Sequence, residues 1–344
     1  MGSAPSKKFH PETDIGDLSG KVILVTGGNS GIGYATIQHL ARRGAKVYMA
    51  GRNEEKGKAA IEKLKKEGLE PGNGDVVWLE LELSDPRKAK SAAEEFRKVE
   101  KRLDVLVNNA ALIMVPHTIL TDGCAVGIGD SELIPSSAGI QDVMMVNYIG
   151  HFVFTMTLLP LLKETAKEPG SDVRIVNVSS DAVQVYGSGL RFRNREDFND
   201  DHAKAWSPAL ARYARSKVAN VLFTKELQRR LDEEGVPIIV LSLHPGTINT
   251  EGNVAFGIRK GGVFGGIYAW ISEHFFTTPT NGAYNSVFAA SAPVVRANPE
   301  TYKGVYLRPT GVISTPGKDG VKPDLAKELW GTTEEILKEI GVDI

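Results

Sequence analysis

A phenol and an amine lie four residues apart in the segment YARSK, which contains Tyr213 and Lys217. Apolar residues such as Val218 and Leu222 follow at helical spacing, so both side chains are expected on one face of a helix. A phenol has a pKa of about 10 in water and needs a neighbouring cation to exchange protons near neutrality. Lys217 can supply that cation. Such a pair also arises by chance, so it indicates a catalytic site only together with other motifs.

A glycine-rich turn, TGGNSGIG, lies between an apolar β-type run and a helical pattern. Gly27, Gly31 and Gly33 would let the backbone approach a pyrophosphate, whose charge meets the N–H groups at a helix N-terminus. An ordinary tight turn that packs a helix against a strand is the alternative. The position of the turn after the first strand favours a dinucleotide site.

The end of the next expected strand bears on which dinucleotide is bound. Gly51 leaves space where an acidic side chain would repel a 2′-phosphate, and Arg52 offers a guanidinium to bind it. These residues favour NADP(H). Alternatively, Arg52 is a solvated loop residue and Glu54 or Glu55 binds the ribose hydroxyls of NAD.

Short β-rich runs alternate with helical periods along most of the chain. This alternation predicts an α/β fold, a Rossmann-type doubly wound parallel sheet of six or seven strands. A single domain is expected over 20–344, after a polar leader at 1–19. We expect strands at Lys21–Thr26, Lys46–Ala50, Val76–Leu81, Asp104–Asn108, Val173–Val178 and Ile238–Leu243, and helices at Gly33–Arg43, Glu54–Glu67, Gln141–Leu162, Tyr213–Glu234 and Asn281–Ala290.

Two polar segments, Thr121–Gly139 and Asp181–Arg212, interrupt this rhythm and are expected to be surface insertions in loops. A glycine-rich apolar stretch at about 252–280 is expected to form a substrate loop, with its apolar run Val263–Ile271 as a lid. For this run, a loosely packed core helix and a weakly membrane-touching patch are the alternatives. Beyond the helix that ends near Ala290, a tail rich in Pro and Gly is expected.

Composition excludes several function classes. The 344 residues carry a formal net charge of −1, so no basic field for a nucleic acid is present. The one cysteine, Cys124, excludes an intramolecular disulfide and a cysteine-rich metal site, as expected in the cytoplasm. We expect no metal and no integral membrane segment. An N-myristoylation pattern at Gly2 leaves peripheral membrane contact open.

Further motifs follow one another in a fixed order: NNA, VN, NVSS, YARSK and HPGT. Together with the TGGNSGIG turn, they resemble the short-chain dehydrogenase/reductase family, over about Leu18 to Leu337. The resemblance implies that Ser180, rather than Ser179, hydrogen-bonds the substrate oxygen and that Tyr213 is the acid/base.

The same resemblance implies the remaining site residues. Lys217 binds the nicotinamide ribose and lowers the pKa of Tyr213, while Asn147 holds a relay water. Two positions depart from the family pattern, Ala111 in place of glycine and Glu82 in place of aspartate. The implied cofactor-binding residues are Gly27, Ser30, Gly31, Ile32, Gly33, Arg52, Leu83, Asn109, Tyr213, Lys217, Ile248 and Thr250.

Phrases such as VNYIGHF and RIVNVSS are most similar to the retinol-dehydrogenase-like group, which includes many fungal reductases. That similarity implies a hydrophobic carbonyl or alcohol as the substrate and leaves both a homodimer and a monomer open. The leading hypothesis is an NADP-dependent carbonyl reductase or alcohol dehydrogenase. A non-catalytic NADP(H)-binding regulator, or an enzyme of this fold catalysing epimerisation, dehydration or C=C reduction, are the alternatives.

Overall fold

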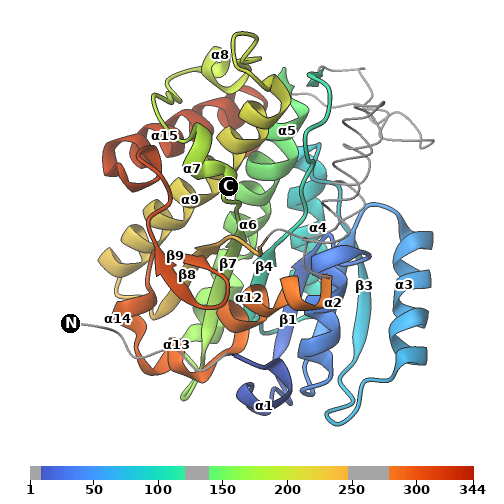
Figure 1. Cartoon of the computed structure of the whole chain (residues 1–344). Coiled ribbons are helices and arrows are strands. Elements are labelled where there is room, and N and C mark those ends of the chain that lie inside the picture. The colour runs from blue at the N-terminus through green and yellow to red at the C-terminus, as the bar shows by residue number, and fades with distance from the viewer. Residues whose placement is uncertain (1–8, 121–138, 247–278) are drawn as a thin grey trace, which may run out of the picture.

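The centre of the molecule is an eight-stranded sheet in the order β10-β9-β8-β7-β4-β1-β2-β3 (Figure 1). The computed structural model describes residues 9–120, 139–246 and 279–344. In this sheet, seven strands run parallel and only the edge strand β10 (Val312–Ser314) is antiparallel. The predicted doubly wound parallel sheet is confirmed. Its parallel strands are β1 (Val22–Thr26), β2 (Lys46–Gly51), β3 (Val76–Glu80), β4 (Val105–Asn108), β7 (Val173–Val178), β8 (Ile238–Leu243) and β9 (Tyr306–Arg308).

The inner strands are apolar along their whole length because both faces of the sheet are covered. Every residue of β1, β4, β7 and β8 is buried. On one face, Leu24 and Leu106 join a core with the helices α4 (Pro86–Val99), α6 (Gly150–Ala166) and α9 (Pro208–Glu233). On the other face, Val25 and Val107 pack towards α2 (Gly31–Ala41), α3 (Glu54–Glu67) and α12 (Pro279–Ser291). Opposite sides of a strand thus serve different helical layers.

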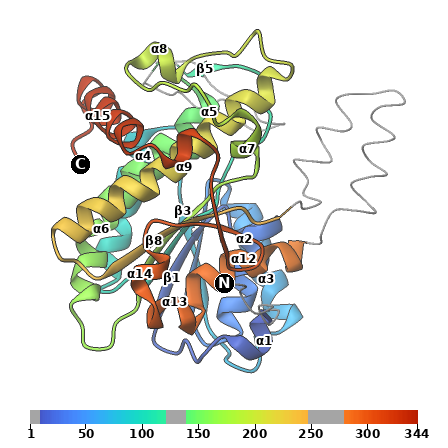
Figure 2. The ribbon, with the colours of Figure 1, turned by 60° about the vertical axis from the view of Figure 1, so that its left-hand side comes forward.

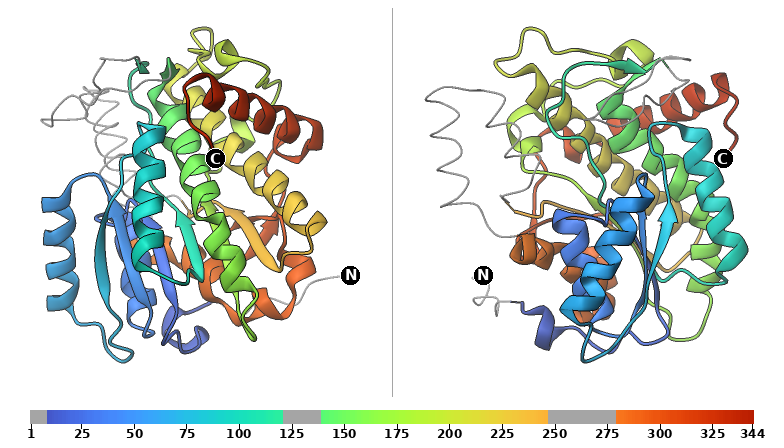
Figure 3. Two further views of the ribbon diagram at one scale, coloured as in Figure 1. Left: turned by 180° about the vertical axis from the view of Figure 1, so that it is seen from behind. Right: turned by 90° about the vertical axis from the view of Figure 1, so that its right-hand side faces the viewer.

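The two helical layers lie on opposite faces of the sheet (Figures 2 and 3). One holds α2 (Gly31–Ala41), α3 (Glu54–Glu67) and α12 (Pro279–Ser291); the other holds α4 (Pro86–Val99), α6 (Gly150–Ala166) and α9 (Pro208–Glu233), with α15 (Pro323–Glu339) over α9. The shorter elements are α1 (Pro11–Asp14), β5 (Ile119–Leu120), β6 (Ile140–Gln141), α5 (Asp142–Met144), a π-helical turn (Met145–Ile149), α7 (Ala182–Tyr186), α8 (Arg195–Phe198), α13 (Pro293–Ala297), α14 (Pro299–Tyr302) and a 3-10 turn (Asp319–Val321).

The continuous helical run Asp142–Ala166 is long and apolar enough to cross a membrane, with a mean hydropathy of 1.4. It is the one such helix in the described part of the chain. However, 78% of its apolar window is buried inside the protein, where it packs against α4 and α9. Burial in the core therefore accounts for its apolar character.

The segment after Ala290 is rich in Pro and Gly, as expected, but it forms strands and helices that the sequence analysis did not predict. This segment adds β9 and β10 to the sheet and ends in α15, whose Trp330 packs edge-on against Phe152 at 4.9 Å between ring centroids. Pro299 and Pro323 stand in the first turns of α14 and α15, where a missing N–H costs nothing. The prolines therefore begin helices here.

Asp181–Arg212 is also more than the surface insertion that we expected. It carries α7 and α8, and Phe192 and Phe198 are fully buried with ring centroids 5.7 Å apart. The buried guanidinium of Arg215 on α9 holds this segment by donating to Arg191 O at 3.1 Å. Thr121–Gly139 lies almost wholly outside the described residues.

Part of the expected polar leader is folded. Residues 9–19 include α1, and Ile15 is only 2% exposed. Phe9 packs edge-on against Phe288 of α12 with centroids 5.3 Å apart. Residues 1–8, which contain the N-myristoylation pattern at Gly2, lie outside the described residues.

Candidate active site

The glycine-rich turn connects β1 to α2 at the carboxyl edge of the sheet. Gly27 and Gly31 have φ angles of +64° and +56°, in the left-handed region that favours glycine. A Cβ added at Gly33 would lie 2.4 Å from Gly27 O. The backbone thus folds onto itself too tightly for any side chain at Gly33.

The N-terminus of α2 has donors available for an anion. Ser30 is its N-cap residue, and its side chain makes no capping hydrogen bond. The first N–H groups of a helix have no partner within the helix, so those of Gly31, Ile32 and Gly33 remain for a ligand. These residues fit the pyrophosphate of a dinucleotide.

Hydrogen bonds hold the turn against the loop after β4. Thr26 Oγ1 accepts from the backbone N–H groups of Asn109 and Ala110, each at 2.9 Å. In return, Asn109 Nδ2 donates to Thr26 O at 2.8 Å. Asn109 therefore shapes the cofactor turn through its amide. Ala111, where the family has glycine, is half-buried beside it.

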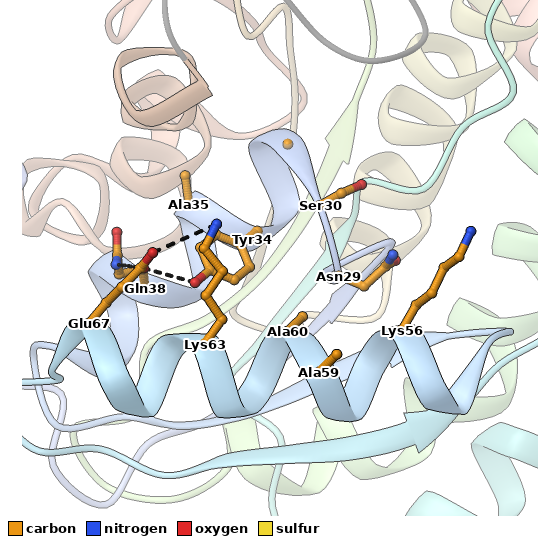
Figure 4. A pocket seen from close by; sticks show the side chains of 11 residues that line it. Asn29, Ser30, Tyr34, Ala35, Gln38, Lys56, Ala59, Ala60, Lys63 and Glu67 are labelled. Carbon is orange, nitrogen blue, oxygen red and sulfur yellow. Dashed lines mark hydrogen bonds and ion pairs between the residues drawn. The ribbon is translucent and has the colours of Figure 1, made fainter.

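A groove of about 800 Å³ continues from the turn between α2 and α3 (Figure 4). Asn29 and Lys56 lie at one end of it, and a pair of hydrogen bonds from Tyr34 and Gln38 to Glu67 closes the other. Asn29 and Lys56 were not among the cofactor-binding residues expected from the sequence. Lys56 stands in the first turn of α3, four residues after Arg52. This spacing, one helical turn from a candidate phosphate-binding residue, was the signal in the sequence that could have identified it.

Arg52 follows β2, is exposed, and makes no ion pair with any residue that the structure describes. Glu54, proposed as an alternative ligand for NAD, instead pairs with Lys58 at 2.8 Å. At Gly51 an added Cβ would approach the Trp78 ring to 3.1 Å, so packing also disfavours a side chain there.

Tyr213 and Lys217 both lie on α9, one turn apart on the same face. The helix begins at Pro208 rather than at Tyr213 as expected, because proline is well suited to a first turn. Lys217 Nζ is 5.7 Å from the centroid of the Tyr213 ring and donates to Val178 O at 2.8 Å. The Lys217 side chain is 1% exposed.

Burial controls both ionisations. It raises the pKa of the Tyr213 phenol to about 12, although a hydrogen bond with Ser180 acts in the opposite direction. Burial lowers the pKa of the Lys217 ammonium to about 7. Desolvation is thus the largest influence on both pKa values, and the lowering of the Tyr213 pKa by the Lys217 cation stays a prediction.

The two serines that end β7 differ in their surroundings. Ser179 is 2% exposed, and its Oγ donates to Lys217 O at 2.8 Å, which fixes α9 to the sheet. Ser180 is partly exposed, accepts from Ala182 N at 3.2 Å, and bonds Tyr213. Of the two, Ser180 is the hydroxyl that lies with the phenol.

Asn147 lies in the π-helical turn Met145–Ile149, so the predicted helix Gln141–Leu162 is not a regular α-helix. Its side chain accepts from Leu112 N at 2.7 Å and donates to Leu112 O at 3.0 Å and to Ser216 Oγ at 2.9 Å. Asn147 thus ties the loop after β4 to α9, next to Lys217. π-Helical turns often occur at functional sites.

The remaining expected cofactor residues are placed only in part. Leu83 is buried, and the Glu82 carboxylate accepts from Ser84 N at 2.9 Å, so it caps its own loop. Ile248 and Thr250 lie outside the described residues, as does nearly all of the expected substrate loop at 252–280.

Comparison with known proteins shows which family this chain belongs to. Residues 21–191 match the family model described as short chain dehydrogenase. A short-chain dehydrogenase/reductase of Armillaria gallica is 43% identical over 339 residues, covering 98% of this chain and 99% of the fungal protein. The chain belongs to the short-chain dehydrogenase/reductase family. It is thus related to oxidoreductases, and the site just described occupies the carboxyl edge of the family's sheet.

Within the short-chain dehydrogenase/reductases, the chain resembles the retinol-dehydrogenase-like group. Human retinol dehydrogenase 11 is 37% identical over 278 residues, which is 81% of this chain and 75% of the human protein. Among solved structures, a Mycobacterium paratuberculosis protein superposes with a TM-score of 0.65 at 27% identity, covering 96% of this chain and 98% of the other. Sequence and architecture therefore agree.

Gly33→Ala is expected to weaken NADPH binding by about tenfold or more, because the added methyl group must displace the Gly27 carbonyl. Fluorescence titration with NADPH measures this. Gly331→Ala is the matched control, since nothing lies within 4 Å of a Cβ there. Equal NADPH affinity in native protein and Gly33→Ala would contradict the assignment of the turn.

Proposed function

We propose that this protein is an NADP(H)-dependent oxidoreductase that interconverts a carbonyl and an alcohol on a hydrophobic small molecule. The observation that carries this proposal is the grouping of Tyr213, Ser180 and Lys217 at the carboxyl edge of the sheet, beside a turn that fits a pyrophosphate. A regulator that only binds the cofactor would not need a buried lysine next to a phenol.

In the direction of reduction, Tyr213 gives its hydroxyl proton to the carbonyl oxygen as that oxygen gains negative charge. Ser180 donates a hydrogen bond to the same oxygen and stabilises the charge. Bound NADPH would supply the hydride for the carbonyl carbon. A proton from solvent then restores the phenol, and we expect Lys217 and Asn147 to form its path. The alcohol and NADP⁺ are the products.

Preference for NADP(H) is supported by positive and polar groups near the expected 2′-phosphate. Arg52 is an exposed cation, and Asn29 and Lys56 line the adjoining groove. Two structural neighbours carry this cofactor in their descriptions, RhlG of Pseudomonas aeruginosa with NADP and an L-sorbose reductase of Gluconobacter frateurii with NADPH. At 23% and 20% identity, they show the shared fold alone.

Arg52→Ala is expected to raise the KM for NADPH by about tenfold or more while leaving that for NADH within about twofold. A charged hydrogen bond to a phosphate typically contributes about 2 kcal/mol to binding, and NADH lacks the 2′-phosphate of NADPH. Steady-state kinetics with both cofactors provide the measurement. Lys58→Ala, an exposed lysine on α3, is the control. A parallel loss for both cofactors would refute a role in discrimination.

The substrate class rests on the likeness to retinol dehydrogenase 11, whose name states a hydrophobic alcohol. Consumption of NADPH should be followed with hydrophobic aldehydes, ketones, quinones and enones, with product analysis. Alcohol products from aldehydes or ketones would support the proposal, and saturated ketones from enones would favour C=C reduction. If NADPH binds with no turnover on any compound, the proposal of a carbonyl reductase fails in favour of the regulator.

A further inference from the structure

His151 is a buried histidine that the proposed mechanism does not use. It stands in the first turn of α6, is 2% exposed, and lies between two parts of the site. Its Nε2 is 2.9 Å from Thr26 Oγ1 in the cofactor turn, and its Nδ1 is 3.3 Å from Asn147 O in the π-helical turn. The imidazole therefore bridges the residues that shape the cofactor turn and the residue beside Lys217.

Hydrogen-bond accounting determines which ring nitrogen carries the proton. Thr26 Oγ1 already accepts two backbone N–H groups, from Asn109 and Ala110. A hydroxyl has two acceptor positions and one proton, so Thr26 has only its own proton left to offer, to His151 Nε2. Nε2 is consequently unprotonated, and Nδ1 carries the hydrogen that it donates to Asn147 O.

The surroundings of the ring keep it in this neutral form. Among the residues that the structure describes, the charged group that acts on it is the Lys217 ammonium, which repels a positive imidazole, and burial acts in the same direction. Together, with burial the larger cause, they lower the pKa of His151 to about 3. The two carbonyls that favour the charged ring, those of Asn147 and Val146, are weaker influences.

We propose that His151, fixed as the Nδ1–H tautomer, is a positioning residue that links the cofactor turn at Thr26 to the Asn147 carbonyl beside Lys217. By holding the Thr26 hydroxyl proton, the ring keeps both Thr26 lone pairs directed at the loop after β4. By donating to Asn147, it fixes the carbonyl of the π-helical turn. This inference rests on the proposed function, since it assigns a role within the same site.

The tautomer can be measured without any activity. Nitrogen-15 NMR of the full chain, with the His151 signals assigned by their loss in His151→Asn, should show protonated Nδ1 and bare Nε2. These shifts should stay constant from about pH 6 to about pH 9, because the ring does not titrate there. A ring that titrates in this range, or one protonated on Nε2, would overturn the proposal whether or not the protein is a reductase.

Two variants separate the two contacts. The amide of His151→Asn lies near the position of Nδ1 and can still donate to Asn147, whereas that of His151→Gln reaches towards Thr26. We expect His151→Asn to weaken NADPH binding about fivefold with kcat nearly unchanged. We expect His151→Gln to bind NADPH normally while kcat falls about tenfold, as the loss of one hydrogen bond allows.

Thr157→Val is the matched control on the same helix, because its buried hydroxyl donates only to Val153 O within α6. It should alter neither the Kd for NADPH nor kcat. If both His151 variants raise the Kd for NADPH and lower kcat together, then His151 only fills space in α6 and the proposal is wrong. The proposal is also wrong if Thr157→Val shows the same defects. Failure of the native chain to bind NADPH would refute the proposed function itself.

Discussion

Tyr213→Phe is expected to lower kcat by about a thousandfold, with NADPH affinity nearly unchanged. The variant retains the ring that packs beside Lys217 but lacks the phenol proton, and the Ser180 hydroxyl that bonds Tyr213 remains. Serine is too weak an acid to donate its proton to the substrate oxygen. Rates of NADPH consumption with an active carbonyl substrate, together with fluorescence titration of NADPH, measure both quantities.

The matched control for that variant is Tyr48→Phe. This substitution also removes one hydrogen bond, the one that the Tyr48 hydroxyl donates to Glu100 at 2.6 Å. Tyr48, however, lies under α4, away from the site. Turnover by Tyr48→Phe should match that of the native protein. Native-like turnover by Tyr213→Phe would eliminate Tyr213 as the acid and would require another donor.

Lys217→Met is expected to abolish turnover and yet to stabilise the fold at neutral pH by about 2 kcal/mol. Burial lowers the pKa of Lys217 from 10.5 to about 7, which corresponds to a few kcal/mol of cost for its charged form. The variant removes this cost but leaves Val178 O without its 2.8 Å donor, a loss of about 1 kcal/mol. Denaturant unfolding monitored by circular dichroism gives the difference in unfolding free energy.

The pH dependence of that difference has a definite sign. Between about 7 and 10.5 the unfolded lysine is protonated and the folded one is largely neutral, so the stability of the native protein rises with pH through this group. The advantage of Lys217→Met should therefore be largest at and below pH 7, and it should shrink as the pH approaches 10.5. Lys58→Met, at an exposed site, should show no such trend. A Lys217→Met protein less stable than native at pH 7 would refute this account of the buried amine.

The position of the C-terminal helix shows one limit of sequence reasoning. Leu325, Leu329 and Ile336 are spaced as in an amphipathic helix, but the sequence analysis expected only a tail rich in Pro and Gly here. Pro299 and Pro323 occupy the first turns of α14 and α15, and Gly331 lies inside α15. From local composition alone, a proline that starts a helix cannot be distinguished from one that breaks it. The contact between Trp330 and Phe152, which packs α15 against α6, is visible only in the folded protein.

The sequence by itself determined the inner strands of the sheet and most of its helices, since apolar, β-branched runs such as Val173–Val178 favour buried parallel strands. It also determined the one-turn spacing of Tyr213 and Lys217, which follows from helix geometry. Only the tertiary structure decided how strongly each group ionises, because desolvation depends on packing from distant segments.

Long-range contacts decided the rest of the site. Thr26, Asn109, Asn147 and His151 are separated by up to 125 residues, yet each makes a hydrogen bond with another of them. Helix spacing relates Asn147 to His151, which follows it by four residues. No spacing rule relates this pair to Thr26 or Asn109, because the parallel strands bring them together only when the sheet assembles. The sequence thus specified which elements form, and the assembled sheet decided which polar groups meet at its carboxyl edge.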